Sequence, residues 1–145
     1  MEAGMRESAD ACEPHPRAGG IFDGQSGTIA AARGIVTAFL TTLSTHHGLT
    51  IATDIPDIAR LVVSELVTNA CKYAPGPCTV DVETDGVWLQ LSVWDSAPTM
   101  PHAAKPEPGR IGQHGLEVVL ALTDSLDIHP QAIGKRVTAR LPLNH

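Results

Sequence analysis

The sequence has few aromatic residues, few cysteines and no long apolar run. Only two Trp, two Phe and one Tyr occur among 145 residues, so a core must be built from Val, Leu, Ile and Ala. The three cysteines show no Cys-x-x-Cys spacing, so they indicate neither a disulfide framework nor a zinc site. A run of about 18 apolar residues and a basic-then-apolar leader are both missing. We therefore expect a cytoplasmic protein without a membrane span.

Positive charge is also scarce. Sixteen acidic residues against ten basic ones give a net charge of -6, which argues against binding to a nucleic-acid backbone. The length suits one domain with a real core. Residues 1–27 are rich in Pro and Gly and poor in apolar positions, so we expect a disordered or loosely attached tail there. Residues 28–145 are then the folded domain.

The apolar spacing predicts two long helices. From Thr28 to about His47, apolar residues recur at i, i+3, i+4 and i+7, and Gly48 follows as a stop. A second helix has Asp54 as its cap and Pro56 in its first turn. It ends before the Pro-Gly-Pro sequence at 75–77.

Two hairpins and a short helix follow. Alternating apolar residues predict strands, with turns at Asp85-Gly86 and Gly134-Lys135. The predicted strands are 79–83, 87–94, 126–128 and 137–141, and the helix is 116–123. This order predicts an α+β two-layer sandwich, in which helices cover one face of a mixed, mostly antiparallel sheet. Consecutive hairpins are not compatible with a parallel doubly wound sheet.

Polar residues lie at the edge of the second helix's apolar face. Glu65, Asn69 and Tyr73 follow one another at i, i+4 and i+8, so they form one ridge. An acid and an amide beside an apolar surface are costly unless something polar is bonded or bound there. Taken alone, the ridge fits a structural role as well as a binding role.

Two further features follow along the chain. Asp95 stands directly after a predicted strand. Gly112 and Gly115 open a predicted helix, whose free backbone N–H groups suit an anion.

In this order the three features resemble the N, G1 and G2 boxes of the ATP-binding fold shared by gyrase, Hsp90, histidine kinases and MutL. The single-domain format, the segment 64–70 (Ser-Glu-Leu-Val-Thr-Asn-Ala) and the ending 134–142 resemble the stand-alone anti-sigma-factor serine/threonine kinases. The resemblance covers residues 29–143, and its N box is the most specific part.

The resemblance implies a Mg-ATP site on the second helix. Asn69 would supply an oxygen ligand to Mg²⁺, and Glu65 would orient or deprotonate the attacking hydroxyl. Lys72 would neutralise phosphate charge, and Tyr73 would pack near the nucleotide.

The resemblance implies roles for the other two boxes as well. Asp95 would accept a hydrogen bond from the adenine amino group, next to Ala97. The loop 98–111 would be a lid. The remaining residues implied to bind the nucleotide and its phosphates are Gly112, His114, Gly115 and Leu116.

The implied function is that of an ATP-binding transcription regulator, with ATP and Mg²⁺ as cofactors. It would sequester a sigma factor and phosphorylate a serine or threonine of an anti-anti-sigma (STAS-like) partner, and homodimers are typical of such proteins. Several positions depart from the family pattern: Ala97 and Thr99 stand where the first glycine box has glycine, Gln113 stands at a glycine of the second glycine box, and Lys135, after the glycine of the final hairpin, stands where Thr is frequent. They leave open a catalytically inactive protein-binding module of the same fold. A histidine kinase is not expected, because no helical hairpin with a phosphoacceptor His precedes the domain.

Overall fold

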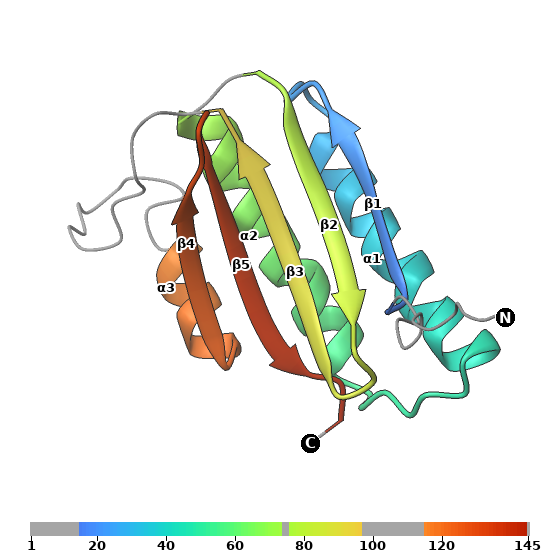
Figure 1. The fold of residues 1–145 in the computed structure, drawn as a ribbon. Coiled ribbons are helices and arrows are strands. Elements are labelled where there is room, and N and C mark those ends of the chain that lie inside the picture. Colours follow the sequence, from blue (N-terminus) through green and yellow to red (C-terminus); the bar gives the residue numbers. More distant parts are fainter. Residues whose placement is uncertain (1–14, 74–75, 97–114, 145) are drawn as a thin grey trace, which may run out of the picture.

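The computed structural model describes residues 15–73, 76–96 and 115–144 of the chain. Five strands and three helices make up these segments (Figure 1). In chain order they are β1 (Arg17–Phe22), α1 (Thr28–His46), α2 (Ile55–Tyr73), β2 (Cys78–Thr84), β3 (Trp88–Asp95), α3 (Gly115–Leu122), β4 (Ser125–Pro130) and β5 (Lys135–Pro142).

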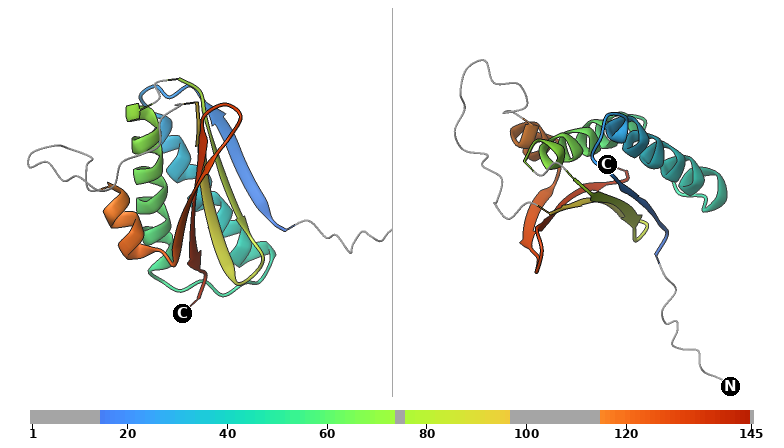
Figure 2. Two further views of the ribbon diagram at one scale, coloured as in Figure 1. Left: turned by 60° about the vertical axis from the view of Figure 1, so that its left-hand side comes forward. Right: turned by 90° about the horizontal axis from the view of Figure 1, so that it is seen from above.

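The strands form one sheet in the order β1-β2-β3-β5-β4. Each pairing between these described strands is antiparallel. Figure 2 shows the three helices together on one face of the sheet, with the other face left uncovered. The predicted α+β two-layer sandwich is confirmed.

Helix α1 follows its predicted bounds closely, and its inward face is apolar. Ala32, Val36 and Leu43 are fully buried, and Gly48 follows the helix at a φ of +65°. By length and composition α1 could cross a membrane. Its apolar stripe nevertheless packs against α2 and β1, as expected of a core helix in a globular domain.

Helix α2 lies at the centre of the helical layer and contacts α1, α3 and β3. Its predicted apolar sector is fully buried, and the core residues from it are Ala59, Val62, Val63, Leu66, Val67 and Ala70. The hydroxyl of Ser64 donates to the Arg60 carbonyl at 2.7 Å, which satisfies a buried polar group inside the helix.

The central hairpin joins β2 to β3 through the predicted Asp85-Gly86 turn. Asp85 Oδ1 accepts the N–H groups of Val87 and Trp88 at 2.9 Å, and Gly86 adopts a φ of +99°. These contacts close the turn tightly and set the register of Val82 opposite Leu91.

Both tryptophans lie on the uncovered face of the sheet, as their alternation with the apolar positions predicts. The guanidinium of Arg140 lies 4.0 Å above the Trp88 ring centre. Trp94 Nε1 donates to the Ile133 carbonyl at 3.0 Å. Each indole is therefore half-covered by a local contact.

The structure differs from the prediction at β1, which lies within the expected tail of residues 1–27. Residues 17–22 pair with β2 along its whole length, and Ala18 and Phe22 pack against the core. Gly19 and Gly20 make this strand difficult to predict from the sequence, because glycines interrupt the alternation of apolar and polar residues. The fold therefore begins earlier than residue 28.

Helix α3 presents apolar residues both to the core and to the surface. Val119 is buried, whereas Leu120 is 52% exposed.

Candidate functional site

The site begins with the ridge on α2. Glu65 and Asn69 are both half-buried, and they border Leu66 and Ala70 of the core. A helix places residues four apart one turn above each other, so the carboxylate and the amide share one ridge. Lys72 and Tyr73 belong to the last turn of α2, but their side chains lie outside the described residues.

Asp95 ends β3 and is almost completely buried. It continues the inward alternation of Leu91 and Val93, so its side chain lies on the helix-covered face of the sheet. The β3–β5 register sets Lys135 directly opposite. Lys135 Nζ donates to Asp95 Oδ1 at 2.9 Å, and each side chain is 1% exposed. A buried ion pair thus takes the place of the apolar pairs farther along the two strands.

Gly134 brings the start of β5 against Asp95. Its φ is +77°, and a Cβ at this position would lie 1.8 Å from the Asp95 carbonyl oxygen. Any larger residue would have to push the two strands apart or leave the left-handed conformation. Glycine is therefore required for the close approach that pairs Lys135 with Asp95.

Two free cysteines lie where the last turn of α2 meets the start of β2. The thiols of Cys71 and Cys78 are hydrogen-bonded to each other. Burial raises the pKa of Cys78 to about 11, with further contributions from Cys71 and from the negative charge of Asp95. Burial also raises the pKa of Cys71. Both thiols are therefore protonated at neutral pH.

The cysteine contact shows how the ridge and Asp95 are related. Cys71 lies two residues beyond Asn69 on α2, and both thiols lie within electrostatic reach of Asp95. Figure 1 shows that α2 and β3 end at the same edge of the domain. The fold therefore brings the last turns of α2 close to Asp95, although the two are separated in sequence.

The other predicted site residues lie wholly or partly outside the residues that the structure describes. Ala97, Gly112 and His114, together with the predicted lid at 98–111, lie outside the described residues. Gly115 and Leu116 begin α3, but the side chain of Leu116 is also outside the described part.

Lys135 contacts a predicted site residue, although the sequence patterns did not place it in the site. Its only signal in the sequence is its position after the glycine of the final hairpin, where Thr is frequent in the family that the chain resembles. Its role depends on a partner 40 residues away in the chain, which only the strand register reveals.

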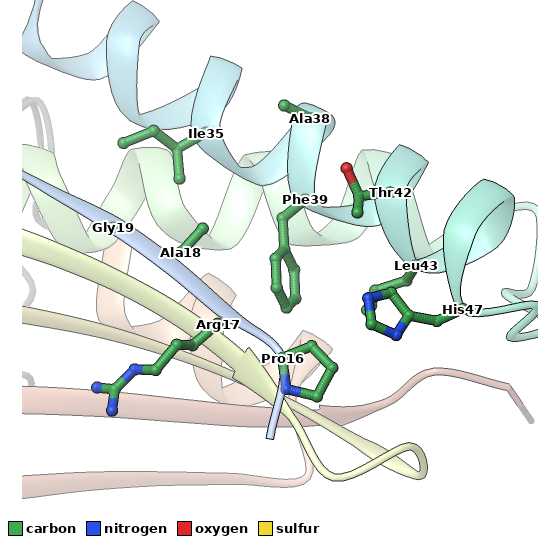
Figure 3. Close-up of a pocket in the computed structure, with 10 residues that line it drawn as sticks. All are labelled: Pro16, Arg17, Ala18, Gly19, Ile35, Ala38, Phe39, Thr42, Leu43 and His47. Atoms are coloured by element: carbon green, nitrogen blue, oxygen red, sulfur yellow. The ribbon is translucent and has the colours of Figure 1, made fainter. Parts of the chain in front are cut away.

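The described residues also form an apolar cavity of about 390 Å³ elsewhere, between β1 and α1 (Figure 3). Phe39 and Leu43 line it from the helix, and Pro16 and Ala18 line it from the strand. Arg17 pairs with Glu83, whereas Asp95 pairs with Cys78, so the cavity lies toward the opposite end of β2 from Asp95. It is separate from the ridge and the buried ion pair.

Comparison with known families gives one result that spans most of the chain. Residues 25–141 match the family model described as a histidine kinase-like ATPase domain. No curated protein matches the chain significantly.

Two solved structures have a similar fold. The crystal structure of the RsbU and RsbW domains of Rv1364c from Mycobacterium tuberculosis superposes with a TM-score of 0.65 at 18% identity, covering 90% of this chain and 32% of that one. The catalytic domain of the histidine kinase ThkA superposes with a TM-score of 0.51 at 16% identity, covering 88% of this chain and 98% of that one. At such identities the likeness is one of fold, and this chain spans about a third of Rv1364c's matched chain.

Proposed function

This chain belongs to the family of histidine kinase-like ATPase domains, and on that premise we propose that it is a regulatory protein that binds Mg-ATP. The nucleotide would lie between the Glu65/Asn69 ridge of α2 and Asp95 at the end of β3. One observation supports the proposal: α2, which carries Glu65 and Asn69, and β3, which carries Asp95, end at the same edge of the domain.

The described residues fit a magnesium ion that is held mainly by the nucleotide. They contain no group of three or more His, Cys, Asp and Glu side chains that could hold a metal alone. Asn69 offers one amide oxygen from a half-buried position, and Mg²⁺ commonly takes one or two protein oxygens together with phosphate oxygens and water. When bound, Mg²⁺ would neutralise phosphate charge.

Glu65 is the residue best placed to assist phosphoryl transfer. It lies one turn before Asn69 on the same ridge, so its carboxylate could orient or deprotonate a hydroxyl nucleophile near the phosphates. Lys72 and Tyr73 in the last turn would contact phosphate and nucleotide. The remaining proposed contacts are Ala97, Gly112, His114, Gly115 and Leu116.

The proposed partners are a sigma factor and an anti-anti-sigma protein of the STAS type, with the latter phosphorylated on a serine or threonine. Support comes from the sequence 64–70 and the ending 134–142, which resemble anti-sigma-factor kinases. We also propose that the protein is cytoplasmic and that it can form a homodimer.

A second candidate function is a protein-binding module that performs no phosphotransfer. Ala97 and Gln113, which stand where the two glycine boxes have glycine, favour it. A Cβ at either position would restrict the close approach of backbone to a nucleotide.

Isothermal titration with Mg-ATP tests nucleotide binding. We expect saturable heat with the wild-type protein and loss of most of it in Asn69→Ala. Thr68→Ala is the control for a polar-to-Ala change on the same helix, because Thr68 is also half-buried but lies about 100° around the helix axis from Asn69. Absence of heat with the wild type, or equal heat in Asn69→Ala, would contradict ATP binding at this ridge.

Phosphotransfer separates the two candidate functions. The purified protein is incubated with γ-labelled ATP and a STAS-type protein encoded beside it. Label on the partner that disappears in Glu65→Gln supports the kinase. Binding of ATP and partner without any transfer of label supports the binding module.

A further inference from the structure

Cys71 and Cys78 bring two free thiols into contact at the edge of the domain where α2 ends and β2 begins (Figure 1). The two side chains are hydrogen-bonded to each other across the connection between these elements. Cys71 is half-buried, so reagents can reach it from solvent, whereas Cys78 is 1% exposed. The proposed function uses neither thiol.

We propose that Cys71 and Cys78 are a redox-sensitive modification site, which a small-molecule disulfide oxidises reversibly to an intramolecular disulfide. The sulfur atoms already contact each other, and the bond requires them to approach to about 2.05 Å. Disulfides in cytoplasmic proteins are mostly transient or redox-sensing. In the compartment proposed for this protein, a reversible bond is therefore the expected form.

The oxidation proceeds by thiol–disulfide exchange and begins at Cys71, the more accessible thiol. Its thiolate attacks one sulfur of the oxidant, which leaves a mixed disulfide on Cys71 and releases one thiolate of the oxidant. The Cys78 thiol then gives up its proton and attacks the Cys71 sulfur. This step forms the bond between the two cysteines and releases the second thiolate. Overall, one disulfide of the oxidant is reduced to two thiols, and the two protein thiols lose two hydrogen atoms.

The bond should displace the end of α2 rather than the start of β2. Cys78 is held inside the sheet, opposite Phe22 of β1 and Asp95 of β3. A Cβ at Gly24 would lie 2.4 Å from the Gly76 carbonyl oxygen, so the turn after β1 also restricts the chain just before β2. The last turn of a helix is less constrained, because its carbonyl groups lack partners within the helix.

This displacement would act on the proposed nucleotide site. Asn69 lies two residues before Cys71, and Lys72 follows Cys71 directly. The consequence rests on the proposed function, in which Asn69 binds Mg²⁺ and Lys72 contacts phosphate. Binding depends on the exact placement of such groups, so oxidation should weaken the binding of Mg-ATP.

The first experiment asks whether the disulfide forms. The whole chain carries Cys12→Ser, which leaves only the two thiols in question. It is equilibrated with glutathione disulfide, and its intact mass is measured while circular dichroism verifies that it stays folded. We expect the loss of two hydrogen atoms, no attached glutathione, and return of the original mass with dithiothreitol. Burial raises the pKa of both thiols and slows the exchange, so each sample is followed to equilibrium.

Two single-thiol variants in the Cys12→Ser background assign the order of the steps. Cys78→Ser should stop at the mixed disulfide, with one glutathione attached to Cys71. Cys71→Ser should stay unmodified, because the remaining thiol of Cys78 is buried. Should Cys78→Ser fail to fold, Cys78→Ala gives the same comparison.

Two results of the mass measurement would overturn the inference. In one, the folded protein with both thiols keeps its mass at every concentration of glutathione disulfide. In the other, it carries glutathione but never loses two hydrogen atoms. Either result would show that the fold does not let the two sulfur atoms reach bonding distance.

Titration with Mg-ATP tests the effect on the nucleotide site. We expect the oxidised protein to bind Mg-ATP roughly threefold or more weakly than the reduced protein. Cys71→Ser should have the same affinity with and without oxidant. Equal affinity of the oxidised and reduced proteins would overturn the proposed displacement of α2. A reduced protein that binds no Mg-ATP would contradict the proposed function, and the mass measurement would still decide whether the disulfide forms.

Discussion

At the scale of single residues, the stability of the domain should depend strongly on the Asp95–Lys135 pair. Asp95→Ala leaves the Lys135 ammonium buried without a counter-charge, which should lower the free energy of unfolding by about 3–5 kcal/mol. The control is Glu83→Ala, which breaks the Arg17–Glu83 pair at 3.9 Å on the surface and should cost at most about 1 kcal/mol. Urea denaturation of both variants measures the difference, and equal losses would contradict the buried pair.

The free energy of unfolding should be equally sensitive to a substitution at Gly134, for a steric reason. Gly134→Ala puts a Cβ against the Asp95 carbonyl and also strains a positive φ, so we expect a loss of more than about 3 kcal/mol. Gly48→Ala is the matched control, because Gly48 has a φ of +65° and open space around its Cβ position. It should cost only about 1 kcal/mol, the strain of the left-handed conformation. Similar losses in thermal unfolding would show that contact with Asp95 is unimportant.

At the scale of elements, the turn of the β2–β3 hairpin should make a small contribution to folding stability that is lost in acid. The N–H groups of Trp88 and Val87 bond to Asp85 and lower its pKa. For a lowered pKa, the stabilisation is present above the unfolded-state value, about pH 4, and is lost as the pH falls through the folded-state pKa.

Asp85→Asn tests this contribution, because it keeps an acceptor at the turn without a titrating charge. We expect the wild type to be the more stable of the two near neutral pH, and the gap to shrink below about pH 4. Denaturant titrations between about pH 2 and pH 7 measure it. A gap that stays constant over this range would contradict a role for the ionised carboxylate.

The elements also differ in how well their sequences predict them. Helices α1 and α2 are predictable because their apolar residues repeat over five turns, and burial follows that repeat. Strand β1 is not, because Gly19 and Gly20 leave it with little alternation of apolar and polar residues, and its place in the sheet depends on pairing with β2. Leu120 is exposed because α3 has only eight residues and lies at the edge of the helical layer, where one face meets solvent.

At the scale of the whole molecule, β1 should behave as part of the folded domain. Phe22 packs against the core from β1, so Phe22→Ala should lower the free energy of unfolding by about 2 kcal/mol. Ile21 is the neighbouring control, since it is 80% exposed and Ile21→Ala should change stability by at most about 0.5 kcal/mol. If Phe22→Ala lowers the free energy of unfolding no more than the control does, β1 contributes little to the stability of the domain.

The candidate site could be predicted in part. Glu65 and Asn69 were identifiable because both lie on one strongly periodic helix, and Asp95 because it ends a clear strand. Lys135 was not, because its partner depends on how β5 pairs with β3, and a hairpin sequence does not specify that register.

The most direct test of the account is a crystal structure of the protein with Mg²⁺ and a non-hydrolysable ATP analogue. The account predicts density between α2 and the end of β3, with the base amino group within hydrogen-bonding distance of Asp95 and the metal beside the Asn69 amide oxygen. A nucleotide bound elsewhere, or bound here with its base turned away from Asp95, would contradict it.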